Sequence, residues 1–433
     1  VLEKHADFLR DFRGDTVHPS TLRLLDDLGL WPQFAKIPQS KVDHAAFGVD
    51  GMSLTMVDFR RLREPHPYIA MVPQWDLLDL LADAGRAEPT FTLRMEHEVT
   101  GLLTEGGRTV GVRYRTPTGE GELRADLTAA CDGRTSVLRQ AAGLTAHEYP
   151  VPFDVWWFRL PHADDAEYTL IPRTAPGRLL IMIPRQGYFQ IAYLIPKGRD
   201  RELRGQGLEA FKAELAALIP EADVSALQSM DDVKFLDVKL NRLKRWHTDG
   251  LLCLGDAAHA MSPVGGVGIN VAVQDAVGAA TLLAEPLRRH DVTDAHLAGV
   301  RRRRLPPAAL TQAVQRVMHR QLVGPILRGE SGDPPAVLVA ALRRLLRGLA
   351  TPEEIELTLR ALPHNPTTEM DLELGDLARG GGGAQLGVGA IQIRHGHQAA
   401  LTHFLDTVTF APGVGDTGLG SLQFGARCID GFC

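Results

Sequence analysis

Residues 250–276 constrain the fold of this chain more than any other stretch. An apolar run at 251–254 ends in Gly255-Asp256, and a segment of small residues then leads into an amphipathic run. This order predicts a buried strand, a tight turn, a loop with few side chains and a helix N-terminus. Such a loop lets backbone N–H groups and the helix dipole approach an electron-rich ligand edge, and the carboxylate can accept hydrogen bonds from sugar-like hydroxyls. The candidate binding residues are Gly255, Asp256, Pro263, Gly265, Gly266, Gly268 and Asn270.

The alternative interpretation of residues 250–276 is a turn that merely needs small residues. It does not explain why the acid, the proline, the glycines and the asparagine occur together at strand-to-helix spacing. We therefore favour a binding loop.

Three further segments follow a recognisable order. Residues 130–139 read ACDGRTSVLR, in which a strand ends in Asp132-Gly133 and a helix begins near Ser136, a suitable N-cap. Residues 13–19 read RGDTVHP, and residues 72–78 read VPQWDLL. With residues 250–276, these segments resemble the motifs of the group A flavin monooxygenases, the para-hydroxybenzoate hydroxylase-like enzymes. The resemblance covers residues 1–325.

The start of the chain departs from that family pattern. The family opens with a strand and a G-x-G-x-x-G turn for the FAD pyrophosphate, and an acidic residue about 20 positions later binds the adenosine ribose. This chain begins Val1-Leu2-Glu3-Lys4, which is similar to the end of the second strand. We therefore expect an N-terminal truncation and weak FAD binding by this chain alone. A literal match to the glycine pattern at 413–418 has no helical run after it, and we interpret it as coincidence.

The resemblance implies a cofactor, a co-substrate and a reaction. FAD would be reduced by NAD(P)H and would then react with O2, and a flavin hydroperoxide would hydroxylate an aromatic or polycyclic organic substrate. No catalytic side chain is implied. The implied cofactor contacts are Glu3 for the adenosine ribose, Arg13 and Gln74 for the flavin linker region, Asp256 for the ribityl chain, residues 265–270 for the pyrimidine edge, and Asp132 and Gly133 for organising the cofactor and the nicotinamide approach.

The periodicity of the chain predicts an α/β (α+β) fold. Alternating segments at 91–130 and 151–196 indicate antiparallel strands, and helices are predicted at 21–34, 77–85, 208–218, 282–302 and 306–327. We expect a Rossmann-like FAD-binding domain, incomplete at its N-terminus, with an inserted, mostly antiparallel substrate-binding sheet that residues 41–59 join. The predicted boundaries are 1–40, 71–148 and 248–285 for the first domain, 41–70 and 149–247 for the second, 286–350 for C-terminal helices and 351–433 for an atypical tail.

Aromatic residues are frequent in the inserted segment. Alternate residues of its strands would line a pocket for an apolar substrate, with Trp157, Tyr188 and Tyr193 as candidates. The alternative for each of them is an ordinary place in the sheet core. We interpret His259 as a packing or hydrogen-bonding residue of the loop, and the role of His18 stays open.

Composition and charge limit which other classes of protein this chain can belong to. The 433 residues are 44% hydrophobic, enough for two cores, and the net charge of −6 argues against a nucleic-acid-binding surface. The basic run at 301–304 is interpreted as a solvated helix face. No 18 consecutive residues are apolar, so we expect no integral membrane segment and a cytoplasmic location. His395, His397 and His403 lack companion ligands, so no metal site is expected. The oligomeric state is not determined by the sequence.

The C-terminal residues differ in character from the rest. Residues 351–372 faintly resemble a segment of phosphoenolpyruvate-utilising enzymes, and the glycine-rich stretches at 380–383 and 412–433 are typical of linkers or disordered chain. We expect no catalysis from this tail.

The sequence as a whole predicts an FAD-dependent monooxygenase that takes a small organic substrate and O2. Two alternatives stay open. A flavin-dependent reductase or dehydrogenase of the same superfamily would share the loop at 250–276 and would not consume O2. A truncated, non-catalytic remnant would keep the fold and fail to hold FAD.

Overall fold

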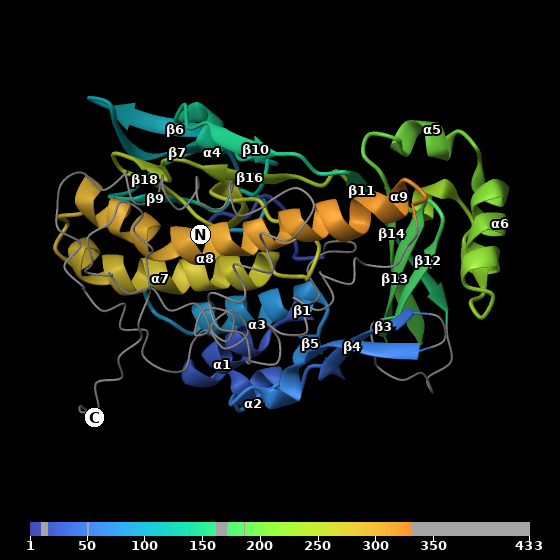
Figure 1. Ribbon diagram of the computed structural model, residues 1–433. Coiled ribbons are helices and arrows are strands. Elements are labelled where there is room, and N and C mark those ends of the chain that lie inside the picture. The colour runs from blue at the N-terminus through green and yellow to red at the C-terminus, as the bar shows by residue number, and fades with distance from the viewer. Residues whose placement is uncertain (10–15, 50–51, 162–170, 186, 331–433) are drawn as a thin grey trace, which may run out of the picture.

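The computed structural model describes residues 1–9, 16–49, 52–161, 171–185 and 187–330, with the side chains of 45–57 and 171 excepted. Long helices and small sheets make up one part of the described chain, and a five-stranded antiparallel sheet lies at its other end (Figure 1). Predictions for Arg13, for the three C-terminal histidines, for the tail and for residues 331–350 of the predicted C-terminal helices fall outside these residues.

Two strands that each precede an Asp/Gly motif lie side by side in the first part. β18 (Leu251–Cys253) is fully buried and pairs in parallel with β9 (Thr128–Ala130), while β17 (His247–Thr248) pairs with the other edge of β18. An isolated parallel bridge also joins Leu2 to Arg94. Buried parallel strands flanked by helices form the Rossmann-like part of the predicted fold.

The N-terminal elements form a small layer beside these strands. β1 (Thr16–Val17), β5 (Ile69–Met71) and β2 (Ser40–Val42) make an antiparallel sheet with β5 in the middle. The helix predicted over 21–34 is two helices, because Gly29 takes a φ of 72° between them. The helices of this layer are α1 (Pro19–Asp27), α2 (Trp31–Phe34) and α3 (Gln74–Arg86).

A hairpin lies beside β12 of the five-stranded sheet, and a meander extends the first part (Figure 1). β3 (His44–Val49) and β4 (Met52–Asp58) pair only with each other among the described strands, so the prediction that residues 41–59 join the large sheet is wrong. The end of the alternating segment predicted at 91–130 divides into β8 and β9, because β9 leaves the meander to pair with β18. The meander strands are β6 (Glu98–Glu105), β7 (Arg108–Thr116) and β8 (Gly119–Arg124); α4 (Val137–Ala141) follows, and β10 (Ala146–Tyr149) pairs with β16 (Leu240–Leu243).

The five-stranded sheet has two buried faces. Its order is β12 (Ile171–Ala175), β13 (Arg178–Arg185), β14 (Tyr188–Pro196), β11 (Phe153–Pro161) and β15 (Lys234–Leu236). The outer face packs on α6 (Leu208–Leu218), which has the predicted bounds, and α5 (Asp200–Arg204) lies nearby. The opposite side, called the inner face below, carries Phe153, Val155, Leu179, Ala192 and Leu194 and packs on the end of the C-terminal helices.

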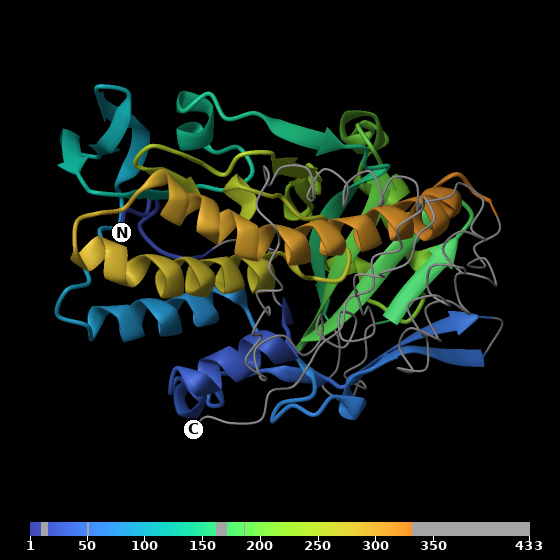
Figure 2. The same cartoon turned by 60° about the vertical axis from the view of Figure 1, so that its left-hand side comes forward.

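Two long helices connect the parts. α7 (Gly268–Arg288) and α8 (Asp294–Met318) lie side by side, and α8 continues through a π-helical turn (His319–Val323) into α9 (Gly324–Leu327) beside the five-stranded sheet (Figures 1 and 2). The predicted break between helices near residue 304 is wrong. The break falls before Thr293, which opens α8 with a capping box to His296, and Pro306 and Pro307 lie inside α8. None of the helices in the described ranges is both long and apolar enough to cross a bilayer.

Candidate functional site

The segment 255–270, called the glycine loop below, follows β18 as the sequence predicts. A 3-10 turn (Gly255–Ala257) starts it, and α7 begins at Gly268. Gly255, Gly265 and Gly266 have φ values of 56°, 82° and 61°, a region that favours glycine. At Gly266 a Cβ would lie 2.1 Å from Oγ1 of Thr16, so a side chain there would clash as well as strain the backbone.

The glycine loop presents unpaired backbone donors. Within the described ranges, the N–H groups of Gly265, Val267 and Gly268 have no acceptor, and Val267 receives no side-chain cap. α7 is 21 residues long, so its N-terminus carries the full positive end of a helix dipole. Donors of this kind fit an electron-rich ring edge or an anionic group.

The side chain of Asn270 makes all its hydrogen bonds within the protein. Its Oδ1 accepts hydrogen bonds from the backbone N of His18 at 2.9 Å and from Oγ1 of Thr21 at 2.8 Å. Its Nδ2 donates to the carbonyls of Thr16 at 2.9 Å and Gly266 at 3.1 Å. Asn270 therefore ties the start of α7 to β1 and α1, and a ligand contact at this position falls to its backbone.

His18 also supports the loop. Burial lowers the pKa of His18 to about 4, so the imidazole is neutral at pH 7. Its Nε2 lies 3.1 Å from the carbonyl oxygen of Gly265 and therefore donates to it. The role that the sequence left open is thus a structural one.

Asp275 of α7 is a fully buried carboxylate behind the turn at Gly255. Its Oδ1 accepts from Nε of Arg304 at 2.7 Å, and its Oδ2 accepts from the N of Gly255 at 3.1 Å and pairs with Nε2 of His259 at 2.5 Å. Burial opposes ionisation, but His259 and Arg304 hold the pKa of Asp275 below its usual value. The prediction of a solvated face at 301–304 is wrong for Arg304, which is 3% exposed.

The Asp132 motif is joined to the glycine loop through arginines. Asp132 accepts from the N of Leu138 at 3.1 Å, which caps α4, and from Oγ of the N-cap residue Ser136 at 2.5 Å. Buried Arg139 donates to the carbonyls of Ala257 at 3.1 Å and Arg134 at 2.8 Å. Gly133 has a φ of 84°, with open space where a Cβ would lie.

Asp256 is the exposed acid of the glycine loop. Its side chain is 32% exposed, and its charged partner in the described chain is Nη2 of Arg134 at 3.9 Å. The carboxylate is therefore available to accept hydrogen bonds from ligand hydroxyls.

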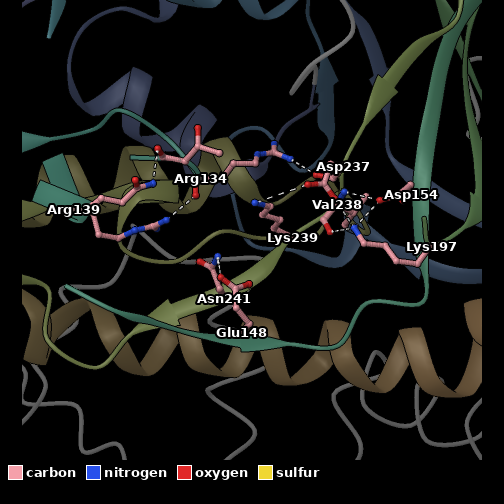
Figure 3. Close-up of polar contacts among 11 residues, drawn as sticks. Arg134, Arg139, Glu148, Asp154, Lys197, Asp237, Val238, Lys239 and Asn241 are labelled. Carbon is pink, nitrogen blue, oxygen red and sulfur yellow. Dashed lines mark hydrogen bonds and ion pairs between the residues drawn. The ribbon is translucent and has the colours of Figure 1, made fainter. Parts of the chain in front are cut away.

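A row of polar contacts runs from these motifs toward the five-stranded sheet (Figure 3). Arg134 donates to the carbonyl of Asp237 at 3.0 Å. Lys197 donates to the carboxylates of Asp237 at 2.6 Å and of buried Asp154 at 2.7 Å. Burial opposes the charge of Lys197, but Asp154 and Asp237 hold its pKa above the usual value. The two parts of the molecule are thus joined by charged groups beside the Asp132 motif.

Gln74 and Glu3 are two further predicted cofactor contacts within the described residues. Gln74 begins α3, and its Oε1 is buried with no hydrogen-bond partner in the described ranges. Ile269 of the glycine loop packs on the cluster that contains Val72 and Leu77, which places the start of α3 beside the loop. Glu3 follows the parallel bridge at Leu2, and its carboxylate accepts from the N of His5 at 3.0 Å.

The candidate substrate residues divide between the two faces of the sheet. Trp157 alternates with Trp156 and packs against the inner-face cluster, and Tyr188 continues the inner face at the start of β14, under the guanidinium of Arg159. Tyr193 lies on the outer face, where it packs on Phe211 and its hydroxyl hydrogen-bonds Glu214 of α6. The prediction that Tyr193 shares a substrate face with Trp157 is therefore wrong.

The indole N–H groups of Trp156 and Trp157 differ in their hydrogen bonding. Nε1 of Trp156 donates to Asp200 at 2.7 Å. Nε1 of Trp157 is buried and has no acceptor in the described ranges. An unpaired buried donor costs about 1–3 kcal/mol, which a ligand oxygen could recover.

Sequence reasoning missed the polar side chains that hold the glycine loop from behind. Their signal was available, because charged and amide residues stand at positions that the helical period assigns to the buried stripes of α7 and α8. These residues are Asp275, Arg304, Gln315 and His319, and Arg139 of α4 is a further buried charge that contacts the loop.

These features fit a flavin dinucleotide. The unpaired donors of Gly265, Val267 and Gly268 fit a ring edge, the accessible carboxylate of Asp256 fits hydroxyls, and the unpartnered Oε1 of Gln74 fits an amide-type donor.

Comparison with known proteins also indicates an FAD-binding protein. A family model described as FAD binding domain matches residues 1–314. The 6-methylpretetramide 4-monooxygenase of Streptomyces rimosus is 32% identical over 360 residues, which cover 81% of this chain and 85% of that protein. Protoasukamycin 4-monooxygenase of Streptomyces nodosus subsp. asukaensis is 26% identical and covers 63% of this chain and 70% of that protein. The solved structure of p-nitrophenol 4-monooxygenase PnpA from Pseudomonas putida shares the fold, with a TM-score of 0.60, 18% identity and coverage of 87% of this chain and 91% of that chain.

Proposed function

Because the chain belongs to the FAD-binding-domain family of monooxygenases, we propose that it hydroxylates an aromatic, multi-ring substrate with NAD(P)H as reductant. One atom of O2 enters the substrate as a hydroxyl, the other leaves as water, and NAD(P)H supplies two electrons. Bound FAD supplies the redox chemistry of this exchange. The substrate class follows the relative named for 6-methylpretetramide, which matches 81% of this chain.

One contact carries the proposal. Val264 of the glycine loop packs against the same cluster as Phe153, Val155, Ala192 and Leu194 of the inner face. A ring held by the loop would therefore adjoin an apolar sheet face, which suits both a flat organic substrate and the exclusion of water.

The chain's own residues have separate tasks in this proposal. The N–H groups of Gly265, Val267 and Gly268 would bind the ring edge. The carboxylate of Asp256 would accept from the ribityl hydroxyls, Oε1 of Gln74 would accept along the linker, and Glu3 would bind the adenosine ribose. Asp132 and Gly133 shape the turn before α4, and Arg139 fixes that turn to the loop. Gly255 and Pro263 contribute the backbone shape of the loop, and Asn270 ties the loop to β1 and α1. Arg13, the remaining predicted contact, lies outside the described residues.

The proposed domains follow from these tasks. Residues 1–40, 71–148 and 248–285 bind the cofactor, and residues 41–70 and 149–247 supply the substrate face. Trp157 and Tyr188 stay in the proposed substrate site, and Tyr193 leaves it.

Three measurements on the full chain test the proposal. FAD is titrated by flavin fluorescence, NAD(P)H oxidation is followed by absorbance, and O2 uptake is followed with an electrode, with and without a polycyclic phenol such as 1-naphthol. The proposal expects FAD binding and coupled consumption of NAD(P)H and O2. NAD(P)H oxidation that does not draw on O2 would favour a reductase, and failure to bind added FAD would refute the proposal.

A further inference from the structure

The segment Ser262–Pro263–Val264 is held between α8 and the inner face of the five-stranded sheet. Val264 packs on the inner-face cluster, together with Leu322 and Val323 of the π-helical turn. The two helix residues that contact this segment with polar groups are Gln315 and His319. The unpaired donors of the glycine loop begin at the next residue, Gly265.

Gln315 hydrogen-bonds the backbone on both sides of Pro263. Its Oε1 accepts from the N of Ser262 at 3.1 Å, and its Nε2 donates to the carbonyls of Ser262 at 2.9 Å and Val264 at 2.8 Å. Gln315 is 3% exposed, so these bonds do not compete with bulk water. Three bonds from one rigidly packed amide fix the path of the loop around the proline.

His319 adds a second contact and links it to the sheet. Its Nε2 lies 2.9 Å from Oγ of Ser262, and its ring meets Phe153 of β11 edge-to-face at 5.1 Å. The π-helical turn starts at His319, and such turns are frequent at functional sites. Within two turns, the same helix therefore holds the glycine loop by its polar side chains and the sheet by Leu322 and Val323.

We infer that Gln315 and His319 are positioning residues that set the distance between the ring-binding donors of Gly265, Val267 and Gly268 and the inner face of the sheet. Their loss would leave the chain folded, but the donors would no longer be held toward one bound ring geometry. This inference rests on the proposed function.

Gln312 provides a matched control one turn earlier on α8. It is 1% exposed and donates to the carbonyls of Asn241 at 2.8 Å and Ala260 at 3.0 Å. Gln312 and Gln315 thus each make two buried donor bonds to backbone carbonyls. Each also accepts one bond through Oε1, Gln312 from Arg242 at 3.0 Å and Gln315 from the N of Ser262. Replacing either one by leucine therefore removes three bonds at equal change in volume, but only Gln315 reaches residues 262–264.

The test compares Gln315→Leu with Gln312→Leu in the full chain by thermal unfolding, FAD titration and hydrogen exchange of residues 262–269. We expect similar losses of thermal stability. We expect FAD affinity to fall roughly tenfold or more only in Gln315→Leu, because the three bonds that order residues 262–264 before the donors are lost. Exchange at 264–269 should rise only in that variant, both with and without FAD.

Gln315→Glu serves if the leucine variant fails to fold. It keeps the volume and the acceptor for Ser262 but loses both donors, so weaker FAD binding with an altered flavin absorbance spectrum is expected. His319→Phe should shift the same spectrum in the same direction. If FAD affinity falls equally in the Gln312 and Gln315 variants, or in neither, the inference is overturned and the proposed function stands. If the wild-type chain binds no FAD, the proposed function and this inference both fail.

Discussion

Replacing Asp275 by asparagine should destabilise the fold more than any other single charge removal near the glycine loop. The carboxylate is 0% exposed and contacts Arg304 at 2.7 Å, His259 at 2.5 Å and the N of Gly255 at 3.1 Å. The variant leaves the guanidinium of Arg304 buried without its counter-charge. Breaking a buried ion pair from one side costs about 3–5 kcal/mol, which lowers Tm by roughly 6–10 °C in a domain of this size.

The loss of thermal stability in Asp275→Asn should decrease at acidic pH. The folded-state pKa of Asp275 lies below its usual value. Its ionised form therefore stabilises the fold above the unfolded-state pKa of about 3.9, and this contribution is lost as pH falls through the folded-state pKa. The Tm difference between wild type and Asp275→Asn should be full at pH 7 and should shrink below about pH 4.

Asp256→Asn is the matched control, since it changes the same charge on the exposed side of the same turn. Its one charged partner in the described chain, Arg134, lies 3.9 Å away, and such pairs are worth about 1 kcal/mol or less. Thermal unfolding of both variants between pH 3 and pH 8 is the assay. An Asp275→Asn protein as stable as the control at pH 7 would refute the reasoning about the buried cluster.

Three further outcomes are expected. Asp256→Ala should weaken FAD binding roughly ten- to hundredfold with little change in Tm, measured by fluorescence titration; unchanged affinity contradicts its assignment. Gly266→Ala should lower Tm more than Gly265→Ala, because a Cβ meets an atom at 2.1 Å in the first and at 3.6 Å in the second; equal losses would rule out the clash. Trp157→Phe should reduce binding of 1-tetralone relative to tetralin, whereas Trp156→Phe should lower Tm and leave that ratio unchanged; an unchanged ratio in Trp157→Phe removes the indole donor from the substrate site.

The sequence predicts the glycine loop well because its constraints are local. A strand end, positive φ angles at Gly255 and Gly266, and a helix start each leave a residue-type signature. The helix at Leu208–Leu218 is predicted to the residue for the same reason, since its apolar period is short and clearly bounded.

Tertiary pairing lies beyond such signatures. From sequence alone, alternation along a strand assigns Trp157 and Tyr193 to different faces only when one face is polar. Here both faces of the sheet are buried, so the sequence carries no such signal. The face that meets the glycine loop is decided by Val264 and by the π-helical turn, which are distant in sequence. The bonds of Gln315 and Asp275 likewise join residues 16 or more positions apart.

Incorporation of 18O from 18O2 tests the central claim most directly. The full chain, supplied with FAD and NAD(P)H, is incubated with a polycyclic phenol under 18O2, and the product is analysed by mass spectrometry. The account predicts a hydroxylated product that carries one 18O atom and fails to form without FAD. A product whose new oxygen comes from water, or NAD(P)H consumption that yields only a reduced substrate, would contradict it.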